Sequence, residues 1–294
     1  MKIGFIGLGV MGNPMAQNIA RRGQHQLCVF DIAPEKASNV VELGAVQVDS
    51  VKQASAGADL VITSLPGPKQ IEQVAFKDGL ISSLSVGAAW VDLSTNNLPV
   101  CHKIVEAAKS EDFDFLDAPV SGGDEGARAG NLTVLVGGEQ KVFDRYLPVL
   151  EIIGENISHL GPNGAGYSAK IAQVVLCYLH SLALSEAMML GVKGGVGKQE
   201  MLSIIQNSTG KSYVADRYGP PILNGDYDPS FTVGLAHKDM KLAMDMADDL
   251  GIVLPMCDLT TNTYKRAVDR YGFGANHLKA VRLLEEQNDT FLQI

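Results

Sequence analysis

Cysteine is scarce in this sequence, and the cysteines that occur are scattered without a C-x-x-C pair. Their spacing argues against a zinc site or a disulfide framework and predicts reduced, mostly buried thiols. We expect no metal site. Basic residues are also few, with 24 Lys and Arg against 33 Asp and Glu and a formal net charge of −9. Because nucleic-acid binding needs a basic surface, we expect no nucleic-acid partner. The cysteines are Cys28, Cys101, Cys177 and Cys257.

No uninterrupted apolar run is long enough to suggest a membrane span, so we expect no membrane partner. The longest apolar segment, residues 171–190, is interrupted by Gln173, His180 and Glu186 and is more typical of a buried helix. The first residues lead directly into a strand, which indicates neither a signal peptide nor a transit peptide. We therefore expect a cytoplasmic protein, with the mitochondrial matrix as the expected compartment in a eukaryote.

The N-terminal segment has the pattern of a dinucleotide-binding turn. Residues 2–6 form an apolar strand, three glycines follow with the spacing G-x-G-x-x-G, and a helix is predicted over residues 11–22, ending at Gly23. The first glycine permits a tight turn, the second lets a pyrophosphate approach the backbone, and the third lets the helix pack on the sheet. A glycine-rich turn that only packs a helix on a strand is the alternative. The expected cofactor contacts are Gly7, Leu8, Gly9, Val10, Met11 and Gly12.

An acidic residue, Asp31, lies directly at the end of the second predicted strand, which covers residues 27–30. At this position a carboxylate accepts the hydroxyls of an adenosine ribose and repels a 2′-phosphate. No arginine lies between Asp31 and Lys36. The sequence therefore favours NAD over NADP.

Strands and helices alternate through the first half of the chain, which predicts a mostly parallel, doubly wound α/β sheet of the Rossmann type. Ligands of such sheets bind beyond the carboxyl ends of the strands. Leu65-Pro66, residues 92–95 and residues 117–123 each follow a predicted strand and are expected at that edge. Further strands are predicted at 60–64, 89–93, 113–117, 132–136 and 157–160, and helices at 35–43, 70–76, 99–110 and 140–152.

Past Gly161 only helical periodicity remains, which predicts an all-α second domain. The 294 residues also exceed the usual size of one core. The glycine-rich segment 161–166 marks the boundary, giving a Rossmann domain over 1–162 and a helical domain over 163–294, joined by one long helix. The predicted helices cover 168–192, 199–207, 233–250, 258–271 and 277–286.

Lys170 lies on an otherwise apolar stretch of the predicted long helix, with Gln173 three residues further on the same face. A buried ammonium is costly, so we expect the pKa of Lys170 to fall and the amine to exchange a proton. The alternative is a lysine that extends from the helix to solvent. Ser121, Gly122 and Gly123 offer a hydroxyl and flexible N–H groups to a carboxylate or alcohol, or form an ordinary tight turn.

Four segments together resemble the signatures of the β-hydroxyacid dehydrogenases. They are the glycine motif, residues 117–123 (DAPVSGG), the pattern Gly161-x-x-Gly164-x-Gly166-x-x-x-Lys170, and residues 237–239 (HKD). The resemblance extends over essentially the whole chain in the right order. It implies a Rossmann domain followed by a helical domain, and oxidation of a small anionic 3-hydroxy acid, such as 3-hydroxyisobutyrate, to its semialdehyde with hydride passing to the nicotinamide.

The resemblance also implies roles for individual residues. Lys170 would be the general acid/base, and Ser121, Gly122 and Gly123 would anchor the substrate carboxylate. The cofactor would contact Leu65, Pro66, Gln70 and Thr95.

Lys238 would reach both cofactor and substrate from the helical domain. One departure concerns Gln173 and Val174, where the family commonly has an asparagine that orients the substrate. Either the pocket holds a different acid, or the Gln173 amide replaces that group. The acidic pair Asp124-Glu125 points to solvent or favours a substrate with an amine, such as serine.

Three further interpretations stay open. One is a reductase of tartronate or succinic semialdehyde that uses NAD(P)H, and a second is a serine-type 3-hydroxyacid dehydrogenase. The third is a nucleotide-sensing or scaffold protein without catalysis, against which Lys170 argues. Imine-reducing relatives usually replace this lysine. We expect a homodimer or homotetramer, because the second apolar face of the long helix needs a partner.

Overall fold

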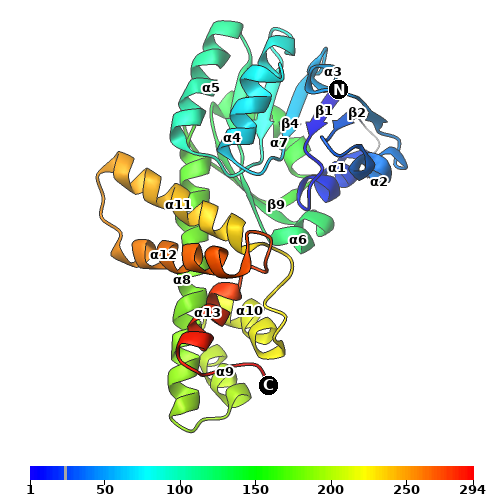
Figure 1. The fold of residues 1–294 in the computed structure, drawn as a ribbon. Helices are drawn as coiled ribbons and strands as arrows, with labels where there is room; N and C mark the ends of the chain where they lie inside the picture. The colour runs from blue at the N-terminus through cyan, green and yellow to red at the C-terminus, as the bar shows by residue number, and fades with distance from the viewer. Residues whose placement is uncertain (23–24) are drawn as a thin grey trace. The chain divides into compact units, whose positions relative to one another are not determined.

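The computed structural model describes residues 1–22 and 25–294 (Figure 1). These residues form two compact units, Met1–Lys170 and Ile171–Ile294. The first unit contains the strands β1 to β9 and the helices between them, and the second unit consists of helices. The α/β class with a helical C-terminal part is therefore confirmed. The predicted end of the first helix at Gly23 lies outside the described residues.

The first unit is built on a nine-stranded sheet, ordered β3-β2-β1-β4-β5-β6-β8-β7, with β9 also paired to β8. All pairings from β3 to β6 are parallel. The carboxyl ends of these strands therefore share one edge. The strands are β1 (Lys2–Ile6), β2 (Gln26–Phe30), β3 (Val46–Gln47), β4 (Leu60–Thr63), β5 (Ala89–Asp92), β6 (Asp114–Asp117), β7 (Val120–Ser121), β8 (Leu132–Gly137) and β9 (Gly154–Gly161).

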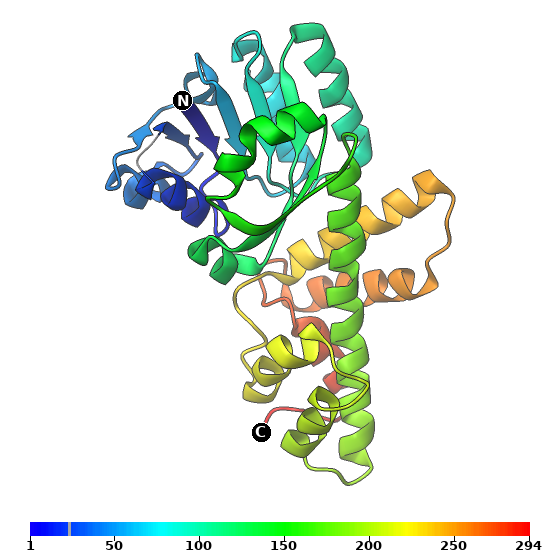
Figure 2. The ribbon, with the colours of Figure 1, turned by 180° about the vertical axis from the view of Figure 1, so that it is seen from behind.

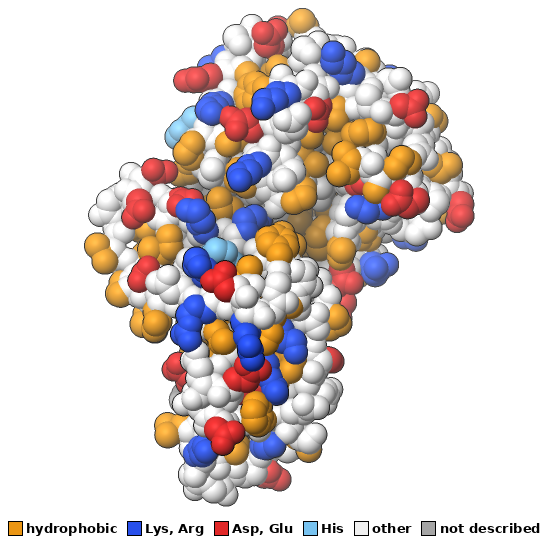
Figure 3. Space-filling model, in the orientation of Figure 1, with side chains coloured by type: hydrophobic (Ala, Val, Ile, Leu, Met, Phe, Trp, Pro, Cys, Tyr) orange, Lys and Arg blue, Asp and Glu red, His pale blue; other side chains and the backbone are white. Residues whose placement is uncertain are grey.

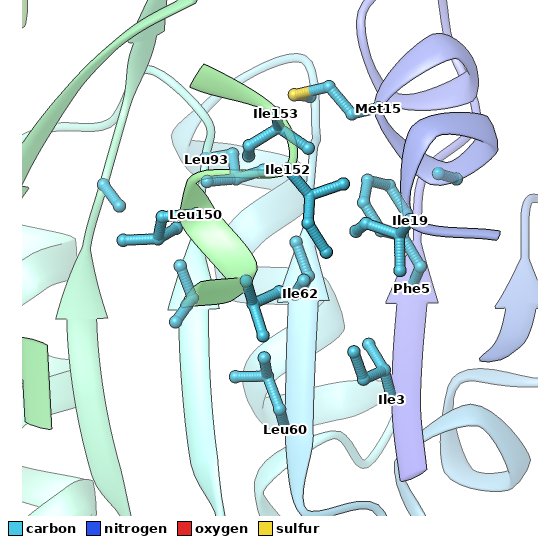
Figure 4. Packing of buried hydrophobic residues seen from close by; sticks show 14 of the residues in the cluster. Ile3, Phe5, Met15, Ile19, Leu60, Ile62, Leu93, Leu150, Ile152 and Ile153 are labelled. Atoms are coloured by element: carbon cyan, nitrogen blue, oxygen red, sulfur yellow. The ribbon is translucent and has the colours of Figure 1, made fainter. Parts of the chain in front are cut away.

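Successive strand residues point to opposite faces, so the sheet has a separate apolar core on each side. On one face Ile3 and Phe5 of β1 pack with Met15 and Ile19 of α1 (Figure 4). On the other face Ile6 packs with residues of α3, α4 and α5. The helices of this unit are α1 (Gly12–Arg21), α2 (Ser38–Val41), α3 (Val51–Ser55), α4 (Pro68–Glu72), α5 (Leu98–Glu111), α6 (Gly123–Ala129) and α7 (Gln140–Leu150).

The local structure around β7 differs from the prediction. A two-residue strand, β7, and a short helix, α6, occupy the segment predicted as a turn. β7 continues the line of β6 along β8, and both pair with β8 in antiparallel register. Only residues 122–131 separate β7 from β8. That segment is shorter than the dozen or so residues that a parallel crossover needs, which explains why the chain turns back here.

Other predicted elements of the first unit differ in detail. The helix expected at 35–43 is split into a 3₁₀ turn, η1 (Pro34–Ala37), and α2. The helix expected at 70–76 is α4 followed by a π-helical segment, η2 (Gln73–Lys77). A further 3₁₀ turn, η3 (Ile81–Ser83), precedes β5. The short elements β3 and α3 were not predicted, because two to five residues are too few for periodicity to register.

Most of α8 (Ala165–Lys193), which is one continuous helix, belongs to the second unit. The other helices of this unit lie on both sides of α8 (Figure 2). One helix of this unit, α10, escaped the sequence analysis. Its Gly219-Pro220-Pro221 segment resembles a loop, yet the helix begins at Ser212, whose hydroxyl accepts the Ala215 N–H at 3.0 Å. The other helices are α9 (Lys198–Gln206), α10 (Tyr213–Asn224), α11 (Val233–Leu250), α12 (Pro255–Tyr271) and α13 (Lys279–Gln287).

Helix α8 is long and apolar enough to cross a membrane by length and composition alone. Half of its most apolar window is buried within the protein. Core helices of soluble proteins have the same properties, so α8 gives only weak evidence for a membrane span.

Candidate active site

The turn after β1 has the geometry that the three glycines predict. Gly7 adopts φ +96°, a conformation that favours glycine, and its N–H donates to the Phe30 carbonyl at 2.8 Å. A Cβ at Gly12 would overlap the Gly7 carbonyl oxygen, so α1 can approach this turn only with glycine at that position. A Cβ at Gly9 would meet no heavy atom within 4 Å. The space in front of Gly9 is therefore open to a ligand.

The beginning of α1 fits a phosphate group. Its first turn contains no acidic residue, and among the described residues no side chain caps its N-terminus. Val10, in the turn before the helix, is 62% exposed. Helix N-termini of this kind bind anions through backbone N–H groups. The residues from Gly7 to Gly12 thus fit the pyrophosphate of a dinucleotide.

Asp31 follows β2 and lies against the same turn. Its Oδ2 accepts the Leu8 N–H at 2.7 Å, and its Oδ1 accepts the Ala33 N–H at 2.9 Å. The Lys36 ammonium lies 3.6 Å from Oδ1. Because each carboxylate oxygen can accept a further hydrogen bond, Asp31 keeps acceptor capacity for ribose hydroxyls. Binding of the ribose by Asp31 stays a prediction.

The loops after β4 and β5 are joined by a hydrogen bond. The Leu65 N–H donates to the Ser94 hydroxyl at 2.8 Å, and Thr95 is the next residue after Ser94. The candidate cofactor contacts Leu65, Pro66 and Thr95 therefore follow neighbouring strands at the same edge as Gly7. Gln70 lies in α4, at an exposed position.

Asp92, the last residue of β5, is fully buried and accepts hydrogen bonds from three hydroxyl groups. Thr63 and Ser94 donate to Oδ1, each at 2.6 Å, and Tyr167 donates to Oδ2 at 2.6 Å. Burial raises the pKa of the Asp92 carboxyl above its ordinary value, and the three hydroxyl groups oppose this shift. Asp92 was expected at the strand edge, but none of its three hydrogen-bond donors was predicted.

Asp117, the last residue of β6, is the cross-strand neighbour of Asp92 and is also buried. It accepts the Gly164 N–H at 2.8 Å and the Tyr167 N–H at 3.1 Å, at the beginning of α8. Burial raises the pKa of Asp117 to about 6, although these hydrogen bonds lower it. A Cβ at Gly137 would lie 2.7 Å from both carboxylate oxygens, so glycine there makes room for the side chain.

The expected substrate anchor lies where β7 ends and α6 begins. Ser121 is the last residue of β7, and the two glycines that follow adopt φ +135° at Gly122 and +66° at Gly123. Both φ values favour glycine. Beyond them, Asp124 lies 3.7 Å from Arg128 on the same short helix. The ordinary tight turn considered for this segment is therefore replaced by a strand-to-helix junction.

Lys170 is half-buried in the second turn of α8, one turn after Tyr167. Gln173 follows one turn later, at an exposed position of the same helix. In the second unit, Lys238 lies on α11 with its ammonium 3.0 Å from Asp239. The buried Asp239 also accepts the Tyr178 hydroxyl at 2.9 Å.

The structure thus gathers most candidate residues of the first unit at one edge of the sheet, and adds several that sequence reasoning missed. The missed residues are Thr63, Asn163 and Tyr167, which bind Asp92 or Asp117. Ser94, which also binds Asp92, belongs to the 92–95 segment expected at this edge. The only available signal was that adjacent strands both end in Asp and that Tyr167 precedes Lys170 by one helical turn. Among the described residues, no three His, Cys, Asp or Glu side chains form a group that could hold a metal ion.

Two family models match the chain in succession. Residues 2–161 match the NAD binding domain of 6-phosphogluconate dehydrogenase, and residues 164–284 match the NAD-binding domain of NADP-dependent 3-hydroxyisobutyrate dehydrogenase.

Individual proteins similar to the chain include named dehydrogenases and a reductase. The chain is 36% identical to 2-(hydroxymethyl)glutarate dehydrogenase of Eubacterium barkeri, over 98% of this chain and 95% of that relative. It is 34% identical to 2-hydroxy-3-oxopropionate reductase of Escherichia coli, over 97% of each. A solved structure of Mycobacterium tuberculosis 3-hydroxyisobutyrate dehydrogenase with L-serine is similar at a TM-score of 0.88 and 30% identity, over 96% of this chain and 98% of that one.

Proposed function

The chain belongs to the β-hydroxyacid dehydrogenase family, and from that premise we propose that it oxidises a small 3-hydroxy acid, such as 3-hydroxyisobutyrate, to the semialdehyde with NAD. It is an NAD(P)-dependent oxidoreductase that acts on a CH–OH group. The observation that supports the proposal is the placement of α8. Asp92 and Asp117, at the strand edge that begins with the dinucleotide turn, bind the helical turn before Lys170.

In this proposal different residues of the chain transfer the proton and bind the substrate. The nicotinamide, when bound, accepts the hydride from the carbinol carbon. Lys170 receives the hydroxyl proton at Nζ as general base, and returns it in the reverse reaction. Ser121, Gly122 and Gly123 bind the substrate carboxylate through the serine hydroxyl and backbone N–H groups.

Three further residues complete the proposed site. Gln173 orients the substrate through its side-chain amide, in place of the asparagine common in the family. Lys238, on α11, adds a positive charge for the anionic substrate and the cofactor. Thr95 contacts the nicotinamide half of the cofactor, and its position next to Ser94 at the end of β5 supports this role.

The test is Lys170→Ala, assayed by NAD reduction with 3-hydroxyisobutyrate, glycerate, serine, 3-hydroxypropionate and 4-hydroxybutyrate. Loss of a general base should lower kcat by about 10²–10⁴-fold and leave the Kd for NADH within twofold. Lys193→Ala removes an exposed lysine from the other end of the same helix and serves as the matched control. Wild-type turnover in Lys170→Ala would refute the assignment.

A serine-type dehydrogenase is a second candidate, favoured by the similar structure that contains L-serine. The acidic residues Asp124 and Glu125 follow the substrate anchor and would suit an ammonium group. Comparison of kcat/KM for serine and for 3-hydroxyisobutyrate separates the two substrates. If serine is the substrate, Asp124→Asn should lower its kcat/KM and leave that of 3-hydroxyisobutyrate unchanged. The reverse reaction with tartronate or succinic semialdehyde tests the reductase alternative.

The cofactor preference depends on Asp31. Its carboxylate accepts two backbone N–H groups beside the glycine turn, which supports a role in binding the ribose hydroxyls, and a 2′-phosphate would be repelled. We expect kcat/KM to be higher with NAD than with NADP, and Asp31→Asn to reduce this ratio. A ratio below one in the wild type would contradict the assignment.

We also propose that the protein is a cytoplasmic homo-oligomer. Hydrophobic side chains gather on the surface over the turn between α11 and α12 (Figure 3). In this region Val253, Met256 and Leu259 are 88%, 62% and 61% exposed. Near the end of α8, Leu190 is also 78% exposed. Apolar surface of this kind is commonly buried between subunits. Light scattering of the wild type and of Val253→Glu tests whether subunits associate and whether this surface contributes.

A further inference from the structure

Two aspartates end adjacent parallel strands and are neighbours in the sheet register. In the register of the sheet, Asp92 lies beside Thr63 of β4 and beside Asp117 of β6. Both carboxylates are completely buried, which is costly unless hydrogen bonds compensate. The hydrogen bonds they accept come from three separate parts of the first unit, namely the end of β4, the loop after β5 and the beginning of α8.

The direction of each hydrogen bond to Asp92 Oδ1 is fixed by its neighbours. The Trp90 indole N–H can only donate, and it donates to the Thr63 hydroxyl at 2.9 Å. Likewise the Leu65 N–H can only donate, and it donates to the Ser94 hydroxyl at 2.8 Å. Each hydroxyl group therefore accepts one hydrogen bond and donates another to Asp92 Oδ1. Asp92 thus binds these groups as an acceptor.

One series of hydrogen bonds leads from Asp92 to the loop after β4. Ser94 donates to the carboxylate and accepts the backbone N–H of Leu65, which fixes the path of the chain at the Leu65-Pro66 segment. Thr95 directly follows Ser94, so it is placed by the same contact. Both segments are candidate cofactor contacts.

A second series leads from Asp92 to α8. The Tyr167 ring is buried, and its hydroxyl donates to Oδ2. The backbone N–H of the same tyrosine donates to Asp117, which also accepts the N–H of Gly164. The first turn of α8 is therefore held at both its backbone and its side chain. Lys170 lies three residues after Tyr167 and so one helical turn beyond this contact.

We propose that Asp92 is a positioning residue that fixes Lys170, through Tyr167, relative to the cofactor loop, through Ser94. This inference rests on the proposed function of Lys170. Hydride and proton transfer need their groups within fractions of an ångström, and a shared buried acceptor meets that need. The position of Tyr167, with its hydroxyl on one aspartate and its N–H on the other, makes it the link to the helix.

The experiment changes one series at a time. Tyr167→Phe removes the hydroxyl that binds Asp92 and keeps the ring. Ser94→Ala removes the acceptor for Leu65, and Ser94→Thr restores a hydroxyl. Tyr146→Phe is the matched control, because Tyr146 is a buried tyrosine whose hydroxyl donates to the Asp59 carbonyl, before β4 begins.

The two series should give different kinetic signatures. We expect Tyr167→Phe to lower kcat about 10-fold or more, with the KM for NAD within twofold, because α8 and Lys170 lose their fixed place. We expect Ser94→Ala to raise the KM for NAD about 5-fold through the loss of one hydrogen bond, and Ser94→Thr to restore it. A kcat of Tyr167→Phe within twofold of wild type, or an equal loss in Tyr146→Phe, would overturn the proposal.

A second measurement does not depend on turnover. The acylation rate of the Lys170 amine by a lysine-selective reagent, quantified by mass spectrometry, should change at least threefold in Tyr167→Phe and stay unchanged in Tyr146→Phe. If the wild type oxidises none of the hydroxy acids, the proposed function fails, and this rate still tests the positioning. Equal acylation rates in wild type and Tyr167→Phe would refute the positioning.

Discussion

Each unit of the protein contains a site built on a buried carboxylate, but the two sites differ in the hydrogen bonding of the polar groups around it. In the first unit, Asp92 and Asp117 accept hydrogen bonds from hydroxyl and backbone donors on every side. In the second unit, Asp228 faces His277, which is buried and makes no hydrogen bond through either ring nitrogen among the described residues. Both carboxylates of the first site therefore have hydrogen-bond donors, whereas the His277 ring of the second site lacks hydrogen-bond partners among the described residues.

The chemistry of the second site follows from burial. His277 Nδ1 lies 3.3 Å from Asp228 Oδ2, but burial lowers the pKa of His277 to about 4, so the imidazole is neutral at pH 7. The rings of Tyr218 and Phe231 cover it, and the charge of Arg217 lowers its pKa further, while Asp228 raises it. A buried polar ring without partners destabilises the fold. The comparison teaches that hydrogen bonds compensate burial at the first site, whereas at the second site a buried imidazole is left without partners within the described part of the chain and acid destabilises the fold there.

The largest expected effect comes from removal of the central acceptor. Asp92→Ala leaves three buried hydroxyl groups without their acceptor, and should lower the free energy of unfolding by about 4 kcal/mol. Asp228→Ala removes the hydrogen bonds from Ser230 and the contact with the neutral His277 ring, and should cost about 1 kcal/mol. Urea unfolding at pH 7 measures both. Equal costs would break the comparison between the two sites.

Acid should destabilise the fold through His277. Since its pKa is lowered in the folded state, the unfolded chain takes up a proton first as the pH falls below 6.5, and stability is lost until about pH 4. The loss between pH 7 and pH 4 should be about 3 kcal/mol. His277→Leu should lack this part of the pH dependence. Urea unfolding at several pH values measures it, and an unchanged slope would contradict the assignment.

Acid should act in the opposite direction through Asp117. Its pKa is raised to about 6, so the folded state binds the proton more tightly than the unfolded chain. Between pH 7 and pH 4 this contributes about 2 kcal/mol of stabilisation as the pH falls. The facing titratable groups are Asp92, Tyr167 and Cys101, and burial together with both aspartates raises the pKa of the Cys101 thiol.

Asp117→Asn removes this contribution, and the change of stability with pH is the quantity to compare. Wild type should gain stability relative to Asp117→Asn as the pH falls from 7 to 4. Hydrogen exchange at the beginning of α8, measured at both pH values, locates the effect. A constant difference between the two proteins would show that Asp117 is ionised throughout.

The smallest effect concerns two serines that donate to buried carboxylates. Ser94 is 4% exposed and holds Asp92, so Ser94→Ala should cost roughly 1.5 kcal/mol. Ser230 is exposed and donates to Asp228, so water can replace its hydroxyl, and Ser230→Ala should cost less than about 0.5 kcal/mol. Thermal unfolding compares the two. A larger cost at Ser230 would reverse the expected order.

Local patterns gave reliable predictions wherever one segment alone determines the structure. The conformation of Gly7, the start of α1 and the place of Asp31 after β2 follow from a continuous stretch of sequence. The helical second half follows from periodicity in the same way. Short elements such as β7 and α6 could not be predicted, because contacts with β8 determine them. The roles of the candidate site residues stay predictions for the variants to test.

The sequence by itself determined the alternation of the longer strands and helices, the glycine turn for a dinucleotide and the family to which the chain belongs. It could also identify Lys170, because that residue ends a recognisable motif. Only the tertiary structure showed what holds the helix of this lysine. Tyr167 binds Asp92 across 75 residues of sequence and Asp117 across 50, and no local pattern records such a contact. The physical reason is that buried carboxylates take their partners from whichever donors the folded sheet brings to its edge.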